Sequence, residues 1–253
     1  MLRREFELIL DRTLSPNRFK DYAPNGLQVE GKNEINRVVT GVTACQALID
    51  AAIEYKADAI FVHHGYFWKG ESPQIVGMKY RRISALIKHD INLYGYHLPL
   101  DAHPELGNNA GLADAIGLDN RASLQPELAI AESIGIVGEL RETISPEDFK
   151  GLIERVVGRD VLLEPSGGSS IRRVALCSGG AQGYIEQAIL VGADVFITGE
   201  VSEQTIHIAR EMGIHFVAAG HHATERFGAR SVAQFLTEEH GLDAVFIDVD
   251  NPA

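Results

Sequence analysis

The sequence predicts an α/β protein made of two related halves, with mixed sheets whose strands are mostly parallel. Three observations support this fold class. The segment 37–64 aligns without a gap with 173–200, and 91–101 aligns with 215–225. Each longer segment reads as a buried strand, a turn of small residues, an amphipathic helix and a second buried strand. Because a strand–helix–strand unit places its two strands parallel, we expect parallel strands in both halves.

A helix and a β-like segment precede each repeat. Apolar residues at helical spacing predict both helices, and Ser145 followed by acidic residues marks the start of the second one. We therefore expect two α/β halves, residues 1–125 and 126–253, without a low-complexity linker between them. The four preceding elements lie at 4–14 and 26–31 in the first half and at 145–158 and 161–165 in the second.

The shorter aligned segments each predict a strand that is followed by His-x-x-x-carboxylate. The alignment places His97 on His221 and Asp101 on Glu225. Between the two aligned blocks the offset changes by 12 residues, which locates an insertion in the first half, within GYFWKGESPQIVGMK. The two halves therefore differ most directly after the strand that ends in His63 and His64.

Charge and composition exclude several classes of protein. The net charge is -12 and no Lys/Arg-rich run occurs, so we expect no binding to duplex nucleic acid. No apolar stretch approaches the roughly 20 residues of a membrane helix, and the N-terminus does not resemble a secretory or transit peptide. Two cysteines without a metal or redox motif fit a reducing compartment, so we expect a cytoplasmic protein whose metals are held by nitrogen and oxygen.

The ends of the predicted strands carry the candidate chemistry. His63 and His64 close one buried strand, and Asp101 and Glu225 follow two others. In open α/β sheets ligands collect beyond the carboxyl ends of the strands. At a strand's end the pleat no longer forces neighbouring side chains to opposite faces, so both imidazoles can turn to the same side. The sequence therefore predicts a metal site at these ends.

The donor set is sufficient for two divalent ions, because paired ions are bound by imidazoles and bridging carboxylates. No thiolate is offered, so Zn, Fe, Mn and Ni are not distinguished. The candidate donors are His63, His64, His97 and Asp101 in the first half and Glu200, His221, His222 and Glu225 in the second.

Simpler explanations apply to several other residues. A single histidine is more often a hydrogen-bonded polar side chain than a ligand, as we expect for His89, His103, His207, His215 and His240. CSGGAQG at 177–183 fits either a phosphate-cradling loop or close packing of a strand against a helix. Tyr66, Phe67 and Trp68 fit either stacking on a planar ring or burial under a loop. Asn25-Gly26 predicts a turn.

Several motifs together resemble the NIF three-like proteins, also labelled GTP cyclohydrolase I type two homologues. The motifs are DYAPNGLQVEG, GVTA, ADAIFVHHGYFWKG, YHLPLDAHPELGNN, DVFITGEVSEQTIH and AAGHHATERFG. The resemblance runs nearly end to end and is weakest from about residue 120 to residue 172. It implies intertwined α/β repeats, a dinuclear metal centre and assembly into a toroidal homohexamer. The family's ligands fall on His63, His64, Asp101, His221 and Glu225, with Glu225 bridging both ions.

The family label implies opening of a purine ring by metal-activated water. The first hypothesis is therefore a metal-dependent hydrolase that acts on a nucleotide, including damaged nucleotides, or a related small molecule. In this hypothesis His97 or Glu200 transfers the proton. The alternative is a non-catalytic metal-binding scaffold or regulatory protein. We rank the hydrolase first, because five or six ligands leave positions open on two ions, as in catalytic sites.

Overall fold

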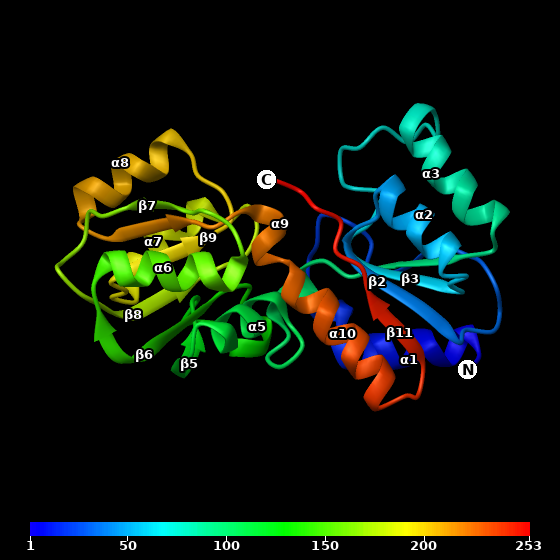
Figure 1. The fold of residues 1–253 in the computed structure, drawn as a ribbon, viewed down its shortest axis with the longest axis horizontal. Coiled ribbons are helices and arrows are strands. Elements are labelled where there is room, and N and C mark those ends of the chain that lie inside the picture. The colour runs from blue at the N-terminus through cyan, green and yellow to red at the C-terminus, as the bar shows by residue number, and fades with distance from the viewer. The chain divides into compact units, whose positions relative to one another are not determined.

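The computed structural model describes residues 1–253, which form two compact units (Figure 1). Unit 1 comprises residues 1–100 and 228–250, and unit 2 comprises residues 101–227 and 251–253. This division differs from the predicted halves, because the C-terminal helix and strand belong to the same unit as the N-terminal segment. The halves 1–125 and 126–253 describe sequence repeats and stay a prediction.

Unit 1 contains a five-stranded sheet in the order β1-β4-β3-β2-β11. All neighbouring strands in it are parallel except β1 and β4, which are antiparallel. The strands are β1 (Gly26–Val29), β2 (Arg37–Thr43), β3 (Ala59–His64), β4 (Asn92–Gly95) and β11 (Asp243–Phe246). The helices are α1 (Arg3–Leu14), the 3-10 turn η1 (Pro16–Arg18), α2 (Gln46–Glu54), α3 (Gly77–Lys88), α4 (Leu98–Ala102), which ends in unit 2, and α10 (Arg226–Glu238), which begins there.

Helices cover both faces of this sheet. Because successive strand residues point to opposite sides, each central strand packs against helices on both faces. Val39 and Ile60 pack with α2 and α3 on one face, whereas Val38 and Phe61 pack with α1 and α10 on the other (Figure 1). The central strands are therefore buried on both faces, as the continuous apolar runs predict.

Unit 2 contains a six-stranded sheet in the order β5-β6-β8-β9-β10-β7. The three repeat strands β8, β9 and β10 are parallel, and the flanking strands pair antiparallel. The strands are β5 (Leu118–Ser123), β6 (Ile136–Ile144), β7 (Leu162–Glu164), β8 (Ile171–Leu176), β9 (Val195–Thr198) and β10 (His215–Ala218). The helices are α5 (Asn108–Ala115), η2 (Ile130–Glu132), α6 (Pro146–Val157), η3 (Gln182–Tyr184), α7 (Ile185–Leu190), α8 (Glu203–Met212) and α9 (His221–Thr224).

The repeat strands keep the same arrangement in both units. In each unit the three repeat strands are parallel and in chain order, with an antiparallel strand beside the last of them, namely β1 beside β4 and β7 beside β10. One aspartate in each unit repeats its contacts as well. Asp58 Oδ2 accepts the N–H of Arg37 at 3.0 Å, and Asp194 Oδ2 accepts the N–H of Arg173 at 2.8 Å. The predicted α/β fold of two related parts is confirmed.

Two local predictions also have structural outcomes. Ser145 caps α6, because its Oγ accepts the N–H of Asp148 at 3.1 Å. None of the helices combines the length and the apolar character that a bilayer crossing requires.

Candidate metal centre

Three imidazoles of unit 1 gather beyond the carboxyl ends of β3 and β4. His63 and His64 are the last residues of β3, and their ring centroids lie 4.4 Å apart. His97 follows β4, and its ring centroid lies 5.0 Å from that of His63 and 5.8 Å from that of His64. One ligand nitrogen from each of the three lies within 4.8 Å of the other two. The neighbouring histidines therefore turn to the same region.

Oxygen atoms of unit 1 hold His63 and His64 through Nδ1. His63 is 1% exposed, and its Nδ1 lies 3.2 Å from the carbonyl oxygen of Tyr96. His64 Nδ1 lies 3.2 Å from Thr43 Oγ1. A carbonyl oxygen only accepts hydrogen bonds, so His63 Nδ1 donates and its Nε2 is the nitrogen that carries the lone pair. Metal-binding histidines are typically oriented in this way.

The segment Asp21–Asn25 holds His97. Asp21 Oδ1 lies 2.6 Å from His97 Nδ1, and its Oδ2 accepts the N–H of Leu98 at 3.0 Å. Asn25 Oδ1 accepts the N–H of His97 at 2.8 Å, and Asn25 Nδ2 donates to Asp21 Oδ2 at 2.9 Å. Asn25 thus fixes the backbone of His97 and Asp21 its imidazole, whereas the turn predicted at Asn25-Gly26 is an irregular residue followed by the start of β1. Sequence reasoning missed Asp21, although DYAPNG is among the family motifs.

Asp21 is a buried carboxylate whose pKa is lowered. Burial raises the pKa of Asp21, but the hydrogen bond and charge of His97, with hydrogen bonds from Asn25 and the N–H of Tyr22, lower it to about 2. Its side chain is 3% exposed. At neutral pH Asp21 is therefore an ionised acceptor for the N–H of the imidazole. Asp21 and Asn25 also line a cavity of about 460 Å³, together with Asp11 and Tyr96.

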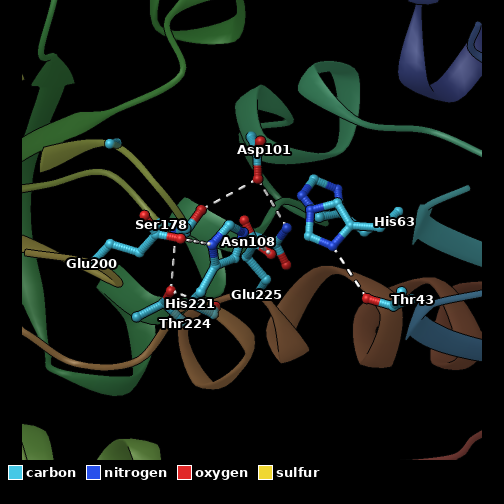
Figure 2. A network of polar contacts seen from close by, with 12 residues as sticks. Thr43, His63, Asp101, Asn108, Ser178, Glu200, His221, Thr224 and Glu225 are labelled. Carbon is cyan, nitrogen blue, oxygen red and sulfur yellow. Dashed lines mark hydrogen bonds and ion pairs between the residues drawn. The ribbon is translucent and has the colours of Figure 1, made fainter. Parts of the chain in front are cut away.

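In unit 2, buried polar side chains hold Asp101 (Figure 2). Asp101 Oδ1 accepts hydrogen bonds from Asn108 Nδ2 at 2.9 Å and from Ser178 Oγ at 3.2 Å. Asn109 Nδ2 donates to the backbone oxygen of Asp101 at 3.1 Å. These contacts fix the orientation of the carboxylate, as expected of partners behind a metal ligand.

His221, at the start of α9, lies between two carboxylates of unit 2. Its Nδ1 is 2.7 Å from Glu200 Oε1, and its Nε2 is 3.2 Å from Glu225 Oε2. The hydrogen bond to Glu225 raises the pKa of His221 to about 9 against the effect of burial, and Glu200 contributes to the rise. His221 therefore carries a proton at neutral pH, and a metal ion bound there must displace it.

The CSGGAQG segment packs closely against Glu225. Gly179 has a φ of +67°, and a Cβ placed there would clash with Glu225 Oε1 and lie 3.1 Å from His221 Nε2. The neighbouring Ser178 contacts Asp101, and one ligand oxygen each of Asp101 and Glu225 lie within 4.8 Å of one another. Glycine at 179 lets the backbone approach the carboxylates. Of the two predicted roles of this loop, packing is the one that the contacts support.

The aromatic residues after His64 divide into two groups. Tyr66 is 5% exposed, and its hydroxyl donates to the carbonyl oxygen of Ala44 at 2.7 Å, so burial explains it. Trp68 packs edge-on against His97, with ring centroids 4.9 Å apart and an interplanar angle of 80°. Its indole N–H donates to the carbonyl oxygen of Gly65 at 3.2 Å. Trp68 therefore borders the imidazole group.

Other histidines are engaged elsewhere. His215 Nε2 lies 2.8 Å from the carbonyl oxygen of Gly168, and its Nδ1 accepts the N–H of Gly167 at 3.2 Å. His103 Nδ1 accepts the N–H of Leu106 at 2.9 Å. Both nitrogens of His215 are used in holding a loop, in contrast to the arrangement around His63.

The chain is similar to known proteins over nearly all of the residues given. The family model Duf34/NIF3 (NGG1p interacting factor 3) matches residues 1–252. The chain belongs to the Duf34/NIF3 family. This confirms the resemblance that the motifs indicated.

Among curated Duf34/NIF3 relatives, the chain is 56% identical to a Haemophilus influenzae protein named GTP cyclohydrolase 1 type 2 homolog, covering 98% of each chain. It is 52% identical to an Escherichia coli protein of the same name, covering 100% of each. A solved structure described as protein ybgI of unknown function matches with a TM-score of 0.95, 52% identity and full coverage of both chains. Reduced HcgD from Methanocaldococcus jannaschii matches with a TM-score of 0.83 and 25% identity, covering 99% of this chain and 98% of HcgD.

Proposed function

We propose that this Duf34/NIF3 protein is a metal-dependent hydrolase that acts on a nucleotide or a related small molecule. The observation that carries the proposal is the anchoring of four imidazoles through Nδ1, each by an oxygen atom of its own unit. Two of these anchors are carboxylates, in the pairs Asp21–His97 and Glu200–His221. Such pairs orient histidines for metal binding, and the name of the curated relatives supports a nucleotide substrate.

The donor chemistry fits a pair of divalent ions. Imidazole and carboxylate donors suit Zn, Fe, Mn and Ni alike, so the proposal does not select one. Bound ions would supply Lewis acidity and lower the pKa of water towards neutrality. The proposed ligands are His63, His64, Asp101, His221 and Glu225, with Glu225 bridging.

The chain supplies the remaining groups that hydrolysis requires. A proton acceptor has to exchange its proton with solvent, and the side chain of Glu200 is 47% exposed whereas that of Asp21 behind His97 is 3% exposed. Glu200 is therefore the first candidate for proton transfer and His97 the second. Trp68 borders the imidazoles and offers a ring surface beside the reaction site.

The alternative function is a metal-stabilised scaffold or regulatory protein. Asp101 begins unit 2 directly after Leu100, and Glu225 lies three residues before Gly228, where the chain returns to unit 1. Ions bound by the proposed ligands would stabilise the folded chain, which is a structural role in itself. From the family resemblance we also propose a toroidal homohexamer in the cytoplasm. Light scattering coupled to size exclusion tests the number of chains in the assembly.

The first experiment is metal analysis of untagged protein by plasma mass spectrometry, followed by hydrolysis assays with that metal. Nucleotides, damaged nucleotides and phosphoesters form the substrate panel. We expect close to two ions per chain, turnover of at least one substrate, and loss of both in Asp101→Ala. His207→Ala, at an exposed position on α8, is the matched control. Two bound ions without any turnover would favour the scaffold, and no bound ion would refute both functions.

A further inference from the structure

We infer that Trp68 and Tyr22 form a binding surface for the planar base of a nucleotide, beside the imidazoles of unit 1. This inference rests on the proposed function and names the part of the substrate that the protein selects. Both residues belong to unit 1, and neither is a proposed metal ligand. The aromatic base, rather than the phosphate, is the group that this surface recognises.

Trp68 is held in place by hydrogen bonds that use each of its polar groups. Its backbone N–H donates to Glu71 Oε2 at 3.0 Å, and its carbonyl oxygen accepts the N–H of Glu71 at 2.9 Å. Its indole N–H donates to the carbonyl oxygen of Gly65 at 3.2 Å. Because these polar groups already have partners, the indole offers a ligand its ring surface, and Trp68 is only partly buried.

The rings that surround Trp68 do not stack on it. His97 packs edge-on, with ring centroids 4.9 Å apart and an interplanar angle of 80°. The ring of His64 is tilted by 56°, with centroids 5.8 Å apart. A nucleobase lies parallel and offset on an aromatic side chain, which is an arrangement that neither imidazole adopts. The indole can therefore still accept a stacked base next to the imidazoles.

Tyr22 adds a second aromatic ring beside His97. Its ring centroid lies 6.4 Å from that of His97, and the residue is 63% exposed. Its backbone is fixed, because its N–H donates to Asp21 Oδ1 at 2.6 Å and its carbonyl oxygen accepts the N–H of Lys69 at 2.6 Å. The bond to Lys69 ties Tyr22 to the residue that follows Trp68. Two aromatic rings thus border one imidazole on an ordered backbone, which lowers the entropy cost of binding.

The backbone before Trp68 adopts a conformation that is typical of ligand sites. Phe67 has a φ of +67°, which is rare for a bulky residue. Lys79 Nζ lies 4.9 Å from the centroid of the Phe67 ring and 3.2 Å from Glu71 Oε1, and these contacts hold the segment in this conformation. Strained residues of this kind cluster where a ligand is bound.

The aromatic segment is present in only one of the two repeats. In unit 1, residues 65–76 join β3 to α3, and they contain Tyr66, Phe67 and Trp68. In unit 2, residues 199–202 join β9 to α8 and contain no aromatic residue. Packing of the shared α/β scaffold therefore does not require an aromatic segment at this position, which favours a role in binding.

The charges of this segment favour a base over a phosphate. Lys79 is engaged by Glu71, donates to the carbonyl oxygen of Ser72 at 3.0 Å, and has a side chain that is only 11% exposed. Lys69 is the other basic residue in 65–79, and the chain as a whole carries a net charge of -12. Such a protein does not attract anions over its surface, whereas stacking of a base does not depend on net charge.

The fluorescence of Trp68 provides the test, because it is the only tryptophan of the chain. The full chain is treated with chelator and titrated with the monophosphates of adenosine, guanosine, cytidine and uridine. Ribose 5-phosphate is the matched probe, because it keeps the sugar and the phosphate but lacks the base. We expect saturable quenching by at least one nucleotide and none by ribose 5-phosphate.

Equilibrium dialysis with the nucleotide that quenches most strongly measures affinity in the variants. Trp68→Leu should weaken binding by about 5- to 150-fold, the range for loss of one stacking aromatic residue. Trp68→Phe keeps a ring and should stay within about fivefold of the unaltered protein. Tyr22→Leu should weaken binding as well. Tyr80→Leu changes a tyrosine on α3 that is 54% exposed, and it is the control that should bind as the unaltered protein does.

The outcomes separate this inference from the proposed function. Equal quenching by ribose 5-phosphate, no quenching by any nucleotide, or unchanged affinity in both Trp68→Leu and Tyr22→Leu would overturn the aromatic surface. If Trp68→Leu does not fold, unchanged affinity in the exposed variant Tyr22→Leu overturns it. Turnover with an unchanged KM in Trp68→Leu would leave the hydrolase standing without this surface. Base-dependent quenching in a protein that hydrolyses nothing would uphold the surface and refute the hydrolase.

Discussion

Replacement of Gly179 by alanine tests whether the backbone beside Glu225 is shaped for the metal centre. The new Cβ would clash with Glu225 Oε1 and lie 3.1 Å from His221 Nε2. The clashing atom is the end of a side chain, so the carboxylate can move away at moderate cost. Glu225 is 3% exposed, however, and any movement takes its oxygen from the position that the surrounding side chains define.

The expected magnitudes follow from these contacts. Alanine at a φ of +67° costs about 1–2 kcal/mol of stability, which corresponds to a melting temperature lower by roughly 2–8 °C for a chain of this length. Displacement of a bridging carboxylate should cost far more in metal binding, with affinity for at least one ion reduced by about tenfold or more. The variant should therefore fold and yet bind metal poorly.

Gly183→Ala is the matched control, because a Cβ at position 183 meets no atom within 4 Å and lies in the same segment. Thermal unfolding by circular dichroism and metal analysis after dialysis measure both effects. We expect Gly183→Ala to match the unaltered protein in both. Full metal content in Gly179→Ala, with a melting temperature within 1 °C of the unaltered protein, would contradict the role assigned to this glycine.

Three further predictions concern charge and hydrogen bonding. Asp58→Asn should lower the free energy of unfolding by about 1.5–3 kcal/mol, measured by urea denaturation. Burial raises the pKa of Asp58, but Lys32 and backbone N–H groups lower it below its usual range. The Asp58 carboxylate therefore contributes fully to the free energy of unfolding above its unfolded pKa near 4, and this contribution is lost as the pH falls through the folded pKa. The difference in stability between the unaltered protein and Asp58→Asn should therefore shrink in acid. The pKa of His221 is raised to about 9, above its unfolded value. Chelator-treated protein should therefore lose stability as the pH rises from about 6.5 to 9, as measured by thermal scans. His221→Gln should not show this loss. Ser178→Ala, which removes a hydrogen bond to Asp101, should weaken metal binding by about 10–100-fold with unchanged secondary structure, as titration with Co²⁺ and circular dichroism will show.

Local pattern and internal repetition predict much of this fold. The alignment of 37–64 with 173–200 places β2, α2 and β3 opposite β8, α7 and β9, and both sets form parallel strands in chain order. The cap at Ser145 could be predicted because an N-cap hydrogen bond joins residues only three apart. The proximity of His63 and His64 could be predicted because they are the last two residues of one strand.

Contacts between distant segments could not be predicted in this way. Asp21 meets His97 across 76 residues, and Ser178 meets Asp101 across 77. Such contacts depend on which helices and loops pack beside a strand end, and neither period nor spacing encodes that. The division into compact units was unpredictable for the same reason. β11 pairs with β2 from the far end of the chain, and no repeat in the sequence predicts this pairing.

The two repeats agree where they build structure and differ where they carry chemistry. Asp58 and Asp194 make equivalent hydrogen bonds to Arg37, the first residue of β2, and to Arg173, the third residue of β8, so the start of each repeat is held by the same contact. At the strand ends, His64 in one repeat corresponds to Glu200 in the other. The neighbouring His63 corresponds to Gly199. These two differences give unit 1 three imidazoles, with His97, and give unit 2 a carboxylate that orients His221. One scaffold thus presents nitrogen-rich donors from one copy and carboxylate-rich donors from the other, which are donor sets that differ in their preference among metal ions.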